Sequence, residues 1–291
     1  MHRTLLAVAA VPLVCIALLL LVAAEGEPQG WSIGTFNSRY ANAGDGANAW
    51  ERRKDMVVAM LREGDVWGLQ EVLPEQVAAI RKDLPEWSMV VRSREKDPAQ
   101  GEACPILFRT DRWELDAEDH GTFWLSETPE VPGSKSWDSS LPRIATFARL
   151  TERGGGRSMY VFNVHLDHQG PQARLEAAKL VARRMASRRH PDPAVLLGDF
   201  NTGPSTPPIR ALLDEAALGL VDAWRAAHPS DAERGTFNGW NERCGAERID
   251  FLLPSRGLEV LRCDIDDRKP DGRWPSDHAA VHATIRPAVA R

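Results

Sequence analysis

The segment AVLLGDFN at residues 194–201 decides the fold class of this chain. Its apolar start is typical of a short buried strand, and Gly198 marks the turn at which the strand ends. Two polar residues, Asp199 and Asn201, follow there on one side of the turn. The segment therefore predicts a strand that delivers a carboxylate and an amide to a sheet edge, although an isolated Gly-Asp after a strand is more often only a turn.

The same design recurs along the chain, with strands and helices in alternation and a polar residue at the end of each strand. Apolar patterns predict strands at residues 31–37, 65–69, 159–164 and 249–253, and amphipathic helices at 50–62 and 171–188. Connectors rich in proline and glycine are predicted to be loops that frame a cleft, at residues 126–142, 202–208 and 268–275.

The residues at the strand ends are of the types that bind a hard divalent cation. Mg²⁺ prefers oxygen ligands and is typically held by one or two carboxylates together with a substrate phosphate. Glu71 is expected to be the direct ligand, and Asp277 a second metal contact. Asn37, on the neighbouring strand, is expected to orient Glu71 or a metal-bound water without adding negative charge.

A second group of residues fits the activation of water. Asp199 is expected to position and deprotonate a water molecule, and Asn201 to donate a hydrogen bond to a phosphoryl oxygen. His278 is the natural partner of Asp250, because a buried carboxylate on one ring nitrogen fixes the tautomer and aims the other nitrogen.

A second histidine is expected to stabilise the developing charge. His165 is placed to donate to the oxygen on which charge develops, with Asp167 behind it. The remaining histidines lie near polar loops and are expected to be solvated bystanders, namely His120, His168, His190 and His228.

Two aromatic residues, Phe237 and Trp240, lie in the segment GTFNGWN close to Asp250 in the sequence. Their rings fit stacking on a nucleic-acid base, a contact worth about 1–3 kcal/mol. Packing within a loop or the core is an equally good interpretation.

The chain opens with an apolar run from Leu5 to Ala24, preceded by Arg3. Residues 1–24 are read either as a signal peptide cleaved near Ala24 or as a retained membrane anchor, since about 20 apolar residues also suffice to span a bilayer. Residues 25–30 are then a short linker and residues 31–291 one large domain, exported and expected to be monomeric.

The net charge and the cysteine content limit the expected mode of nucleic-acid binding and the number of disulfides. The formal net charge of −5 is not that of a protein that coats nucleic acid, but it permits transient contact with a few phosphates. Beyond the apolar run the cysteines number three, so one internal disulfide at most can form. Cys244 with Cys263 is the preferred pair, and three reduced thiols are the alternative.

Six motifs, taken as an ordered set, resemble the endonuclease/exonuclease/phosphatase superfamily, the DNase I-like metallophosphoesterases. They are TFN (35–37), LQE (69–71), HLD (165–167), GDFN (198–201), RIDFL (248–252) and SDH (276–278). The resemblance spans residues 31–291. Segments 121–129, 143–150 and 163–174 are most similar to the bacterial branch related to the carbon catabolite repressor 4 and nocturnin exonucleases.

The resemblance implies an α+β fold, a four-layer αββα sandwich of two mostly antiparallel sheets flanked by helices, with Mg²⁺ or Mn²⁺ at one sheet edge. The resemblance implies a role for each residue at a family position. Metal binding falls to Asn37 and Glu71, phosphate stabilisation to His165, and orientation of the nucleophile to Asp199 and Asn201. The acid and histidine positions that end the motif set are Asp250, Asp277 and His278. The abasic-site endonucleases carry a second acid where this chain has Arg39, so their metal arrangement is in doubt here and Arg39 is expected to contact a substrate phosphate instead.

Together these expectations describe an exported, Mg²⁺-dependent phosphoesterase, with nuclease or exonuclease action favoured and nucleic acid bound transiently. The alternatives are a phosphatase or a phospholipase-C-like enzyme acting on inositol phosphate or sphingomyelin head groups, although the sequence shows no obvious apolar hairpin for membrane contact. A non-catalytic anchored binding protein is the remaining alternative, and such a protein is expected to have lost Glu71, Asp199 or His278, all of which are present.

Overall fold

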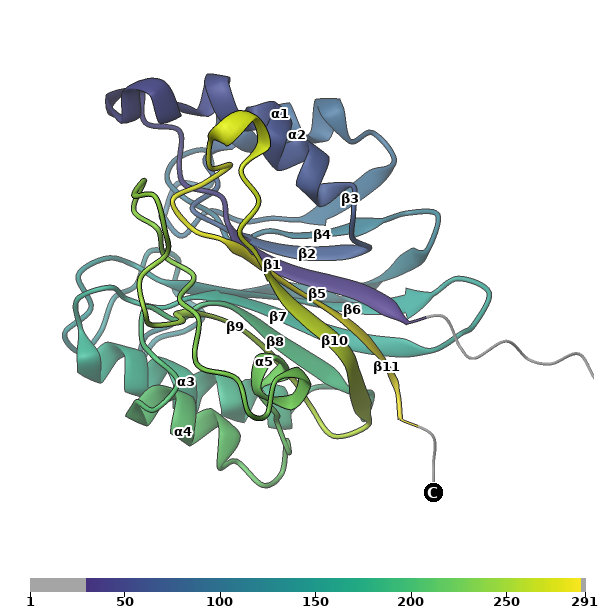
Figure 1. The fold of residues 1–291 in the computed structure, drawn as a ribbon. Helices are drawn as coiled ribbons and strands as arrows, with labels where there is room; N and C mark the ends of the chain where they lie inside the picture. The colour runs from purple at the N-terminus through teal and green to yellow at the C-terminus, as the bar shows by residue number, and fades with distance from the viewer. Residues whose placement is uncertain (1–29, 289–291) are drawn as a thin grey trace, which may run out of the picture.

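A computed structural model describes residues 30–288 as two β-sheets that pack face to face, with helices on both outer faces (Figure 1). One sheet has six strands in the order β10-β11-β1-β2-β4-β3, and the other has five in the order β5-β6-β7-β8-β9. Helices α1 and α2 cover the first sheet, and α3 and α4 cover the second (Figure 1). The expected four-layer sandwich is confirmed.

The six-stranded sheet consists of β1 (Trp31–Asn37), β2 (Val66–Gln70), β3 (Trp87–Val90), β4 (Ile106–Arg109), β10 (Leu258–Asp266) and β11 (Ala280–Pro287). The five-stranded sheet consists of β5 (Trp113–Trp124), β6 (Ile144–Glu152), β7 (Ser158–His165), β8 (Ala194–Asp199) and β9 (Asp250–Pro254). The helices are α1 (Trp50–Leu61), α2 (Pro74–Asp83), α3 (Pro171–Ala186), α4 (Pro207–Leu213) and α5 (Ala223–Ala227), with short 3-10 turns η1 (Ala43–Asn48) and η2 (Pro270–Gly272).

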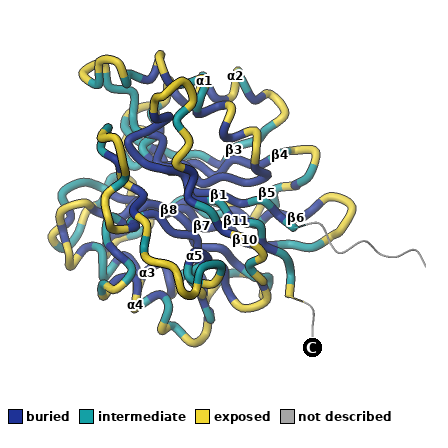
Figure 2. The backbone as a smooth tube through the Cα atoms, viewed as in Figure 1, coloured by how far each residue is buried: buried dark blue, intermediate teal, exposed yellow. Residues whose placement is uncertain are grey.

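Apolar side chains fill three layers, and the backbone segments that carry them are coloured as buried in the interior of Figure 2. The layer between the sheets contains Trp31, Val66, Trp113, Leu150, Val161 and Leu197. The layer under α1 and α2 contains Trp50, Val57, Leu61 and Leu69, and the layer under α3 and α4 contains Phe162, Val181, Leu196 and Phe251. Burial on this scale is the main favourable term in folding.

Strand register brings the chemical residues to one edge of the sandwich. Strands β7 and β8 are parallel and joined by α3, so His165 lies opposite Asp199 at their common end. Strand β9 is antiparallel to β8, and its first residue, Asp250, pairs with Asp199. In the other sheet, β1 and β2 are parallel and joined by α1, and Asn37 lies opposite Gln70. The ends of β7, β8 and β9, which carry His165, Asp199 and Asp250, therefore meet the ends of β1 and β2, which carry Asn37 and Gln70.

A buried polar contact joins the sheets directly beneath this edge. Gln70 Nε2 donates to Asn163 Oδ1 at 2.7 Å, and Asn163 Nδ2 donates to the carbonyl oxygens of Leu69 and Pro105 at 2.8 and 2.9 Å. Gly68 allows this close approach, because a Cβ there would lie 2.8 Å from Asn163 Cγ. The sheets are thus held together by hydrogen bonds as well as by apolar packing.

Most predicted elements are found within one or two residues of their expected bounds. Strand β1 has its expected bounds, and α3, expected at 171–188, ends at Ala186, two residues earlier. Residues 126–142 contain no helix or strand, as expected of a loop. The periodicity did not reveal the strands β3, β4, β5, β6, β10 and β11, or the helices α2, α4 and α5.

Two other expectations concern the N-terminus and the cysteines. Residues 1–24, and 25–29 of the linker, lie outside the described residues. Within residues 30–288 no helix has the length and apolar character needed to cross a bilayer.

The preferred Cys244–Cys263 disulfide is wrong, because both residues and Cys104 are free thiols. Cys263 is buried in the core between the sheets, which satisfies a thiol without a partner.

Candidate active site

A cleft of about 450 Å³ opens at the edge where the strand ends meet. Eight of the residues singled out in the sequence line it, namely Arg39, Glu71, His165, Asp199, Asn201, Phe237, Asp277 and His278. Asn37 and Asp250 lie directly behind this lining and contact it through hydrogen bonds.

The buried amide of Asn37 connects two carboxylates. Its Nδ2 donates to Glu71 Oε1 at 3.1 Å and to Asp199 Oδ2 at 2.9 Å. The other oxygen of Glu71 accepts from the backbone N–H of Tyr40 at 3.2 Å. Glu71 also adopts a positive φ of 62°, which is costly for a residue with a side chain. The surrounding contacts hold it in this conformation with its carboxylate facing the cleft.

Asp199 lies between two histidines at the end of β8. Its Oδ1 accepts from the Asn201 backbone N–H at 2.8 Å, and its Oδ2 lies 3.5 Å from His165 Nε2 and 3.8 Å from His278 Nε2. Burial, followed by repulsion from the Asp250 carboxylate, raises the pKa of Asp199. A carboxylate with a raised pKa is a better proton acceptor, which suits a general base.

His278 and Asp250 form a buried pair. His278 Nδ1 lies 2.9 Å from Asp250 Oδ2, which also accepts a hydrogen bond from the Thr236 hydroxyl at 2.5 Å. Burial alone would lower the pKa of His278, but Asp250, Asp199 and Asp277 outweigh it and raise that pKa to about 10. The imidazole therefore carries a positive charge at neutral pH and points Nε2–H toward Asp199.

Asp277 and Arg39 form the far side of the cleft. Asp277 Oδ2 lies 3.6 Å from Arg39 Nη1, and burial and the nearby Glu71 carboxylate raise the pKa of Asp277. Two of the five N–H groups of the Arg39 guanidinium are engaged elsewhere, because its Nε and Nη2 donate to Asp45 at 3.0 Å each. Arg39 lines the cleft, and its contact with a substrate phosphate stays a prediction.

His165 and Asn201 complete the inner lining. Burial, with repulsion from Arg143 and Arg94, lowers the pKa of His165 well below its usual value, so the ring is neutral. Asn201 has a positive φ of 50° and donates one amide hydrogen to the Leu166 carbonyl at 3.0 Å. Its second amide hydrogen is available to the cleft.

Asp167 does not lie behind His165, so that part of the interpretation is wrong. Its Oδ2 accepts from the Ser140 backbone and hydroxyl at 3.1 and 2.7 Å, and its Oδ1 accepts from the Gly170 N–H at 2.8 Å. These contacts fasten the loop at residues 126–142 to the start of α3. The buried Asp167 side chain is enclosed by this loop and does not reach the cleft.

The two aromatic residues have different positions. The Phe237 ring lines the cleft, is 46% exposed, and packs edge-on against the His278 imidazole with 5.0 Å between centroids. Trp240 does not line the cleft, and the guanidinium of the buried Arg53 lies 5.8 Å from its ring centroid. Trp240 is therefore a loop-packing residue, as the alternative interpretation stated.

Several cleft residues were missed by the sequence reasoning. Arg94, Glu102 and Arg143 line the cleft, and so does His168, which was expected to be a bystander. Arg143 and His168 lie in segments quoted for the family resemblance. His168 follows His165 by three positions, which was the available signal, whereas Arg143 is distant from His165 in the sequence. Arg94 lies in the irregular connection between β3 and β4, where no pattern marked it.

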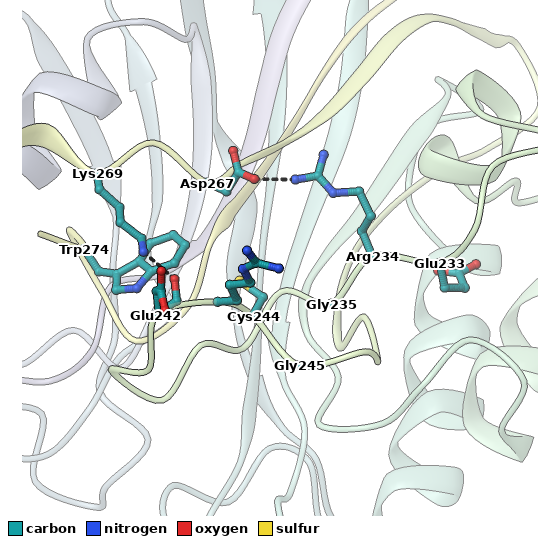
Figure 3. Close-up of a pocket in the computed structure, with 10 residues that line it drawn as sticks. Glu233, Arg234, Gly235, Glu242, Cys244, Gly245, Asp267, Lys269 and Trp274 are labelled. Atoms are coloured by element: carbon teal, nitrogen blue, oxygen red, sulfur yellow. Dashed lines mark hydrogen bonds and ion pairs between the residues drawn. The ribbon is translucent and has the colours of Figure 1, made fainter. Parts of the chain in front are cut away.

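A separate hollow of about 520 Å³ lies beside the loop at residues 235–245 (Figure 3). Its charged groups are largely engaged with one another, since Arg234 donates to Asp267 and Lys269 lies over the Trp274 ring and donates to the Glu242 carbonyl. None of the residues expected to act in catalysis or in metal or substrate binding lines it. We therefore assign the candidate active site to the cleft of about 450 Å³ and not to this hollow.

The donor set of the cleft fits a hard divalent cation at Glu71 and Asp277. Their carboxylates line the same space, and the raised pKa of Asp277 reflects burial and an excess of negative charge that a cation would relieve. Asp199, Asp250 and His278 are also close enough to hold a metal. In that trio, Asp250 binds only Nδ1 of His278, and Nε2 faces Asp199 at 3.8 Å, an arrangement that serves proton handling as well.

A further acid and histidine cluster lies outside the cleft, formed by Asp116, Asp119 and His190. Its carboxylates are occupied, because Arg149 donates to Asp116 and the Tyr160 hydroxyl donates to Asp119. Structural ion pairing accounts for this cluster.

Known proteins with similar structures come from bacteria and from a eukaryote. An endonuclease/exonuclease/phosphatase from Bacteroides vulgatus is 32% identical, with a TM-score of 0.82 over 89% of this chain and 99% of that one. A mannosyl-6-phosphatase from Bacteroides thetaiotaomicron is 31% identical, with a TM-score of 0.79 over 88% and 99%. The catalytic domain of human Nocturnin, at 17% identity and a TM-score of 0.70 over 89% and 95%, shares the fold.

A curated relative and a family model complete the comparison. A protein of Acanthamoeba polyphaga mimivirus is 26% identical over 165 residues, and the match spans 53% of this chain but only 59% of the viral protein. The model of the Endonuclease/Exonuclease/phosphatase family matches residues 34–278. This chain therefore belongs to the endonuclease/exonuclease/phosphatase family, whose members are divalent-metal-dependent hydrolases of phosphoester bonds.

Proposed function

We propose that this protein is a Mg²⁺-dependent phosphoesterase, with Mn²⁺ as an alternative cation, whose substrate is a small phosphate ester. The observation that carries the proposal is the Asn37 amide, which holds Glu71 and Asp199 at 3.1 and 2.9 Å on the wall of one cleft. A metal-binding carboxylate and a water-activating carboxylate are thereby fixed side by side. This is the arrangement that hydrolysis of a phosphoester requires.

Glu71 and Asp277 would hold the cation. When bound, it would neutralise phosphate charge and favour attack at phosphorus. Asn37 and the Tyr40 N–H orient the Glu71 carboxylate so that each of its oxygens keeps a lone pair toward the cleft.

The surrounding side chains supply the proton transfer and the charge stabilisation. Asp199 accepts a proton from the attacking water. At the same time the water oxygen bonds to phosphorus, the ester P–O bond breaks and the alcohol leaves. The charged His278, held by Asp250, and the neutral His165 donate hydrogen bonds to phosphoryl oxygens as negative charge develops. Asn201 contributes its free amide hydrogen.

A small phosphate ester is supported by three observations. The relative at 31% identity is named a mannosyl-6-phosphatase. The cleft, at about 450 Å³, has the size of a small-molecule site. The net charge of −5 does not favour a long polyanion.

Nuclease action is the second candidate. It is favoured by Phe237, which exposes an aromatic ring at the cleft where a base could stack.

One panel of substrates separates these candidates. The purified protein is incubated with Mg²⁺, Mn²⁺ or EDTA and with hexose phosphates, inositol phosphates, sphingomyelin, single-stranded RNA, single-stranded DNA and duplex DNA. The proposal expects metal-dependent phosphate release from a hexose or other small phosphate ester, at a kcat/KM at least about 100-fold above that on oligonucleotides. Preferential shortening of an oligonucleotide would establish the nuclease candidate instead, and no metal-dependent turnover would overturn both.

We also propose, from the apolar run at residues 5–24, that the enzyme acts outside the cytoplasm, either released or anchored to the membrane. Cell fractionation with an antibody to the C-terminal domain tests this. Recovery in the cytosolic fraction alone would contradict it.

A further inference from the structure

One wall of the cleft carries three hydrogen-bond donors, with the Glu102 carboxylate beside them. Arg94 comes from the connection between β3 and β4, Arg143 immediately precedes β6, and His168 precedes α3. All three line the same cleft as Glu71 and Asp277. The Arg94 and Arg143 side chains are only 11% and 5% exposed, so their charges are held in a partly desolvated environment.

These two guanidinium groups are not fully satisfied by their neighbours. Arg94 Nη1 donates to Glu102 at 2.7 Å, and its buried Nε makes no hydrogen bond but lies 3.6 Å from Glu95 Oε1, a long ion pair. Arg143 Nε reaches Asp167 Oδ2 at 3.4 Å, an oxygen that Ser140 already occupies with two shorter hydrogen bonds. Buried donors in this state favour an anionic ligand.

The third donor follows from the chemistry of arginine. Arg143 Nη2 lies 2.9 Å from His168 Nδ1. A guanidinium has no acceptor, so Nδ1 must accept this hydrogen bond. The proton of the His168 ring is then on Nε2, which is a donor as well.

We propose that Arg94, Arg143 and His168 form a subsite for the terminal oxygens of a phosphate monoester, and that this subsite makes the enzyme prefer monoesters to diesters. This inference rests on the proposed function. A monoester carries about −1.5 to −2 charges and three terminal oxygens, whereas a diester has one charge and two such oxygens. His165 adjoins both arginines across a small cavity, so a phosphate that His165 contacts is within reach of this wall.

Matched substrates test the preference. The variants Arg143→Met and Arg94→Met are assayed with Mg²⁺ on p-nitrophenyl phosphate and on bis-p-nitrophenyl phosphate. Each variant is expected to lose about 10-fold or more in kcat/KM on the monoester, the scale of a lost charge-assisted hydrogen bond, and less than about 3-fold on the diester. Equal losses on both esters, or no loss on the monoester, would overturn the subsite.

Binding of inorganic phosphate provides a readout independent of turnover. Calorimetric titration of the metal-free protein is expected to show phosphate binding that Arg143→Met and Arg94→Met weaken and that Arg234→Met preserves. Arg234 is a matched control, because it loses the same charge but lies in the separate hollow of Figure 3. Weakening by Arg234→Met to the same extent would show a general charge effect and contradict the proposal.

His168 offers a variant with little risk to folding, since it is exposed. His168→Ala is expected to weaken phosphate binding, and His168→Gln to restore part of it through its amide donor. No effect of His168→Ala would exclude His168 from the subsite. A protein that binds phosphate through these residues but hydrolyses neither ester would retain the subsite and lose the proposed function, so the two failures are distinguishable.

Discussion

Gln70 Nε2 lies 2.7 Å from Asn163 Oδ1, and this contact links the two sheets one residue before Glu71. The sheets carry different halves of the cleft, so their spacing sets the distance between the metal-binding and water-activating carboxylates. A displacement of about 1 Å is enough to slow a well-oriented reaction by about 100-fold.

Asn163→Leu removes this link while keeping a similar volume. Three hydrogen bonds would be lost. The Gln70 amide keeps Thr35 and Gly68, and the Pro105 carbonyl keeps the Leu69 N–H. The Leu69 carbonyl loses its side-chain donor, and an unsatisfied buried group costs about 1–3 kcal/mol. We expect the free energy of unfolding, measured by urea denaturation, to fall by about 2 kcal/mol or more. An unchanged unfolding midpoint would show that apolar packing alone sets the spacing of the sheets.

Asp199→Asn tests the general base. The amide keeps the shape of the side chain but cannot accept a proton, so the rate should fall by about 100-fold or more with the fold intact. Steady-state kinetics and circular dichroism are the measurements. Asp192→Asn, at a partly exposed position paired with Arg149, is the control expected to retain activity. Near-normal turnover by Asp199→Asn would assign the base to another group.

His278 and Asp250 should behave as one unit. His278→Ala removes the charged donor, and Asp250→Ala removes the carboxylate that holds and charges the ring. We expect each variant to be nearly inactive and the double variant to be little worse than either alone. Losses that simply multiply in the double variant would indicate independent roles.

Glu71→Gln should raise the Mg²⁺ concentration needed for half-maximal activity, because an amide is a weaker ligand than a carboxylate. Glu75→Gln, on the exposed side of α2, removes the same charge nearby and serves as control. Metal titrations of both variants give the comparison. Identical curves for Glu71→Gln and the wild type would remove Glu71 from the metal site.

Asp167 should make stability depend on acidity. Burial alone would raise its pKa, but backbone and hydroxyl hydrogen bonds from Gly170, Ser140 and Gln169 outweigh burial and hold the pKa well below its usual range. The stabilisation is therefore present above the unfolded-state pKa of about 4 and is lost as the pH falls below it. Melting temperatures from pH 7 to pH 3 should fall less steeply for Asp167→Asn than for the wild type.

The sequence predicted the strand ends well and the loops poorly, for a physical reason. Asp199 and His165 follow apolar runs, and strand pairing then dictates that they meet. Asp167 was misplaced because its surroundings depend on how the loop at residues 126–142 folds back, which no local pattern encodes. Arg94 was missed for a similar reason, since it belongs to an irregular segment whose position is set only by the packed sheets.

The first and last strands of the domain lie side by side, with β1 paired to β11. Ser276, just before β11, donates its hydroxyl to the Asn37 carbonyl at 2.7 Å, so residues 239 positions apart in the sequence meet at the cleft. A growing chain thus holds nearly all of its chemical groups long before they can act together. The cleft can therefore close only after the last strand has been synthesised and has paired with the first.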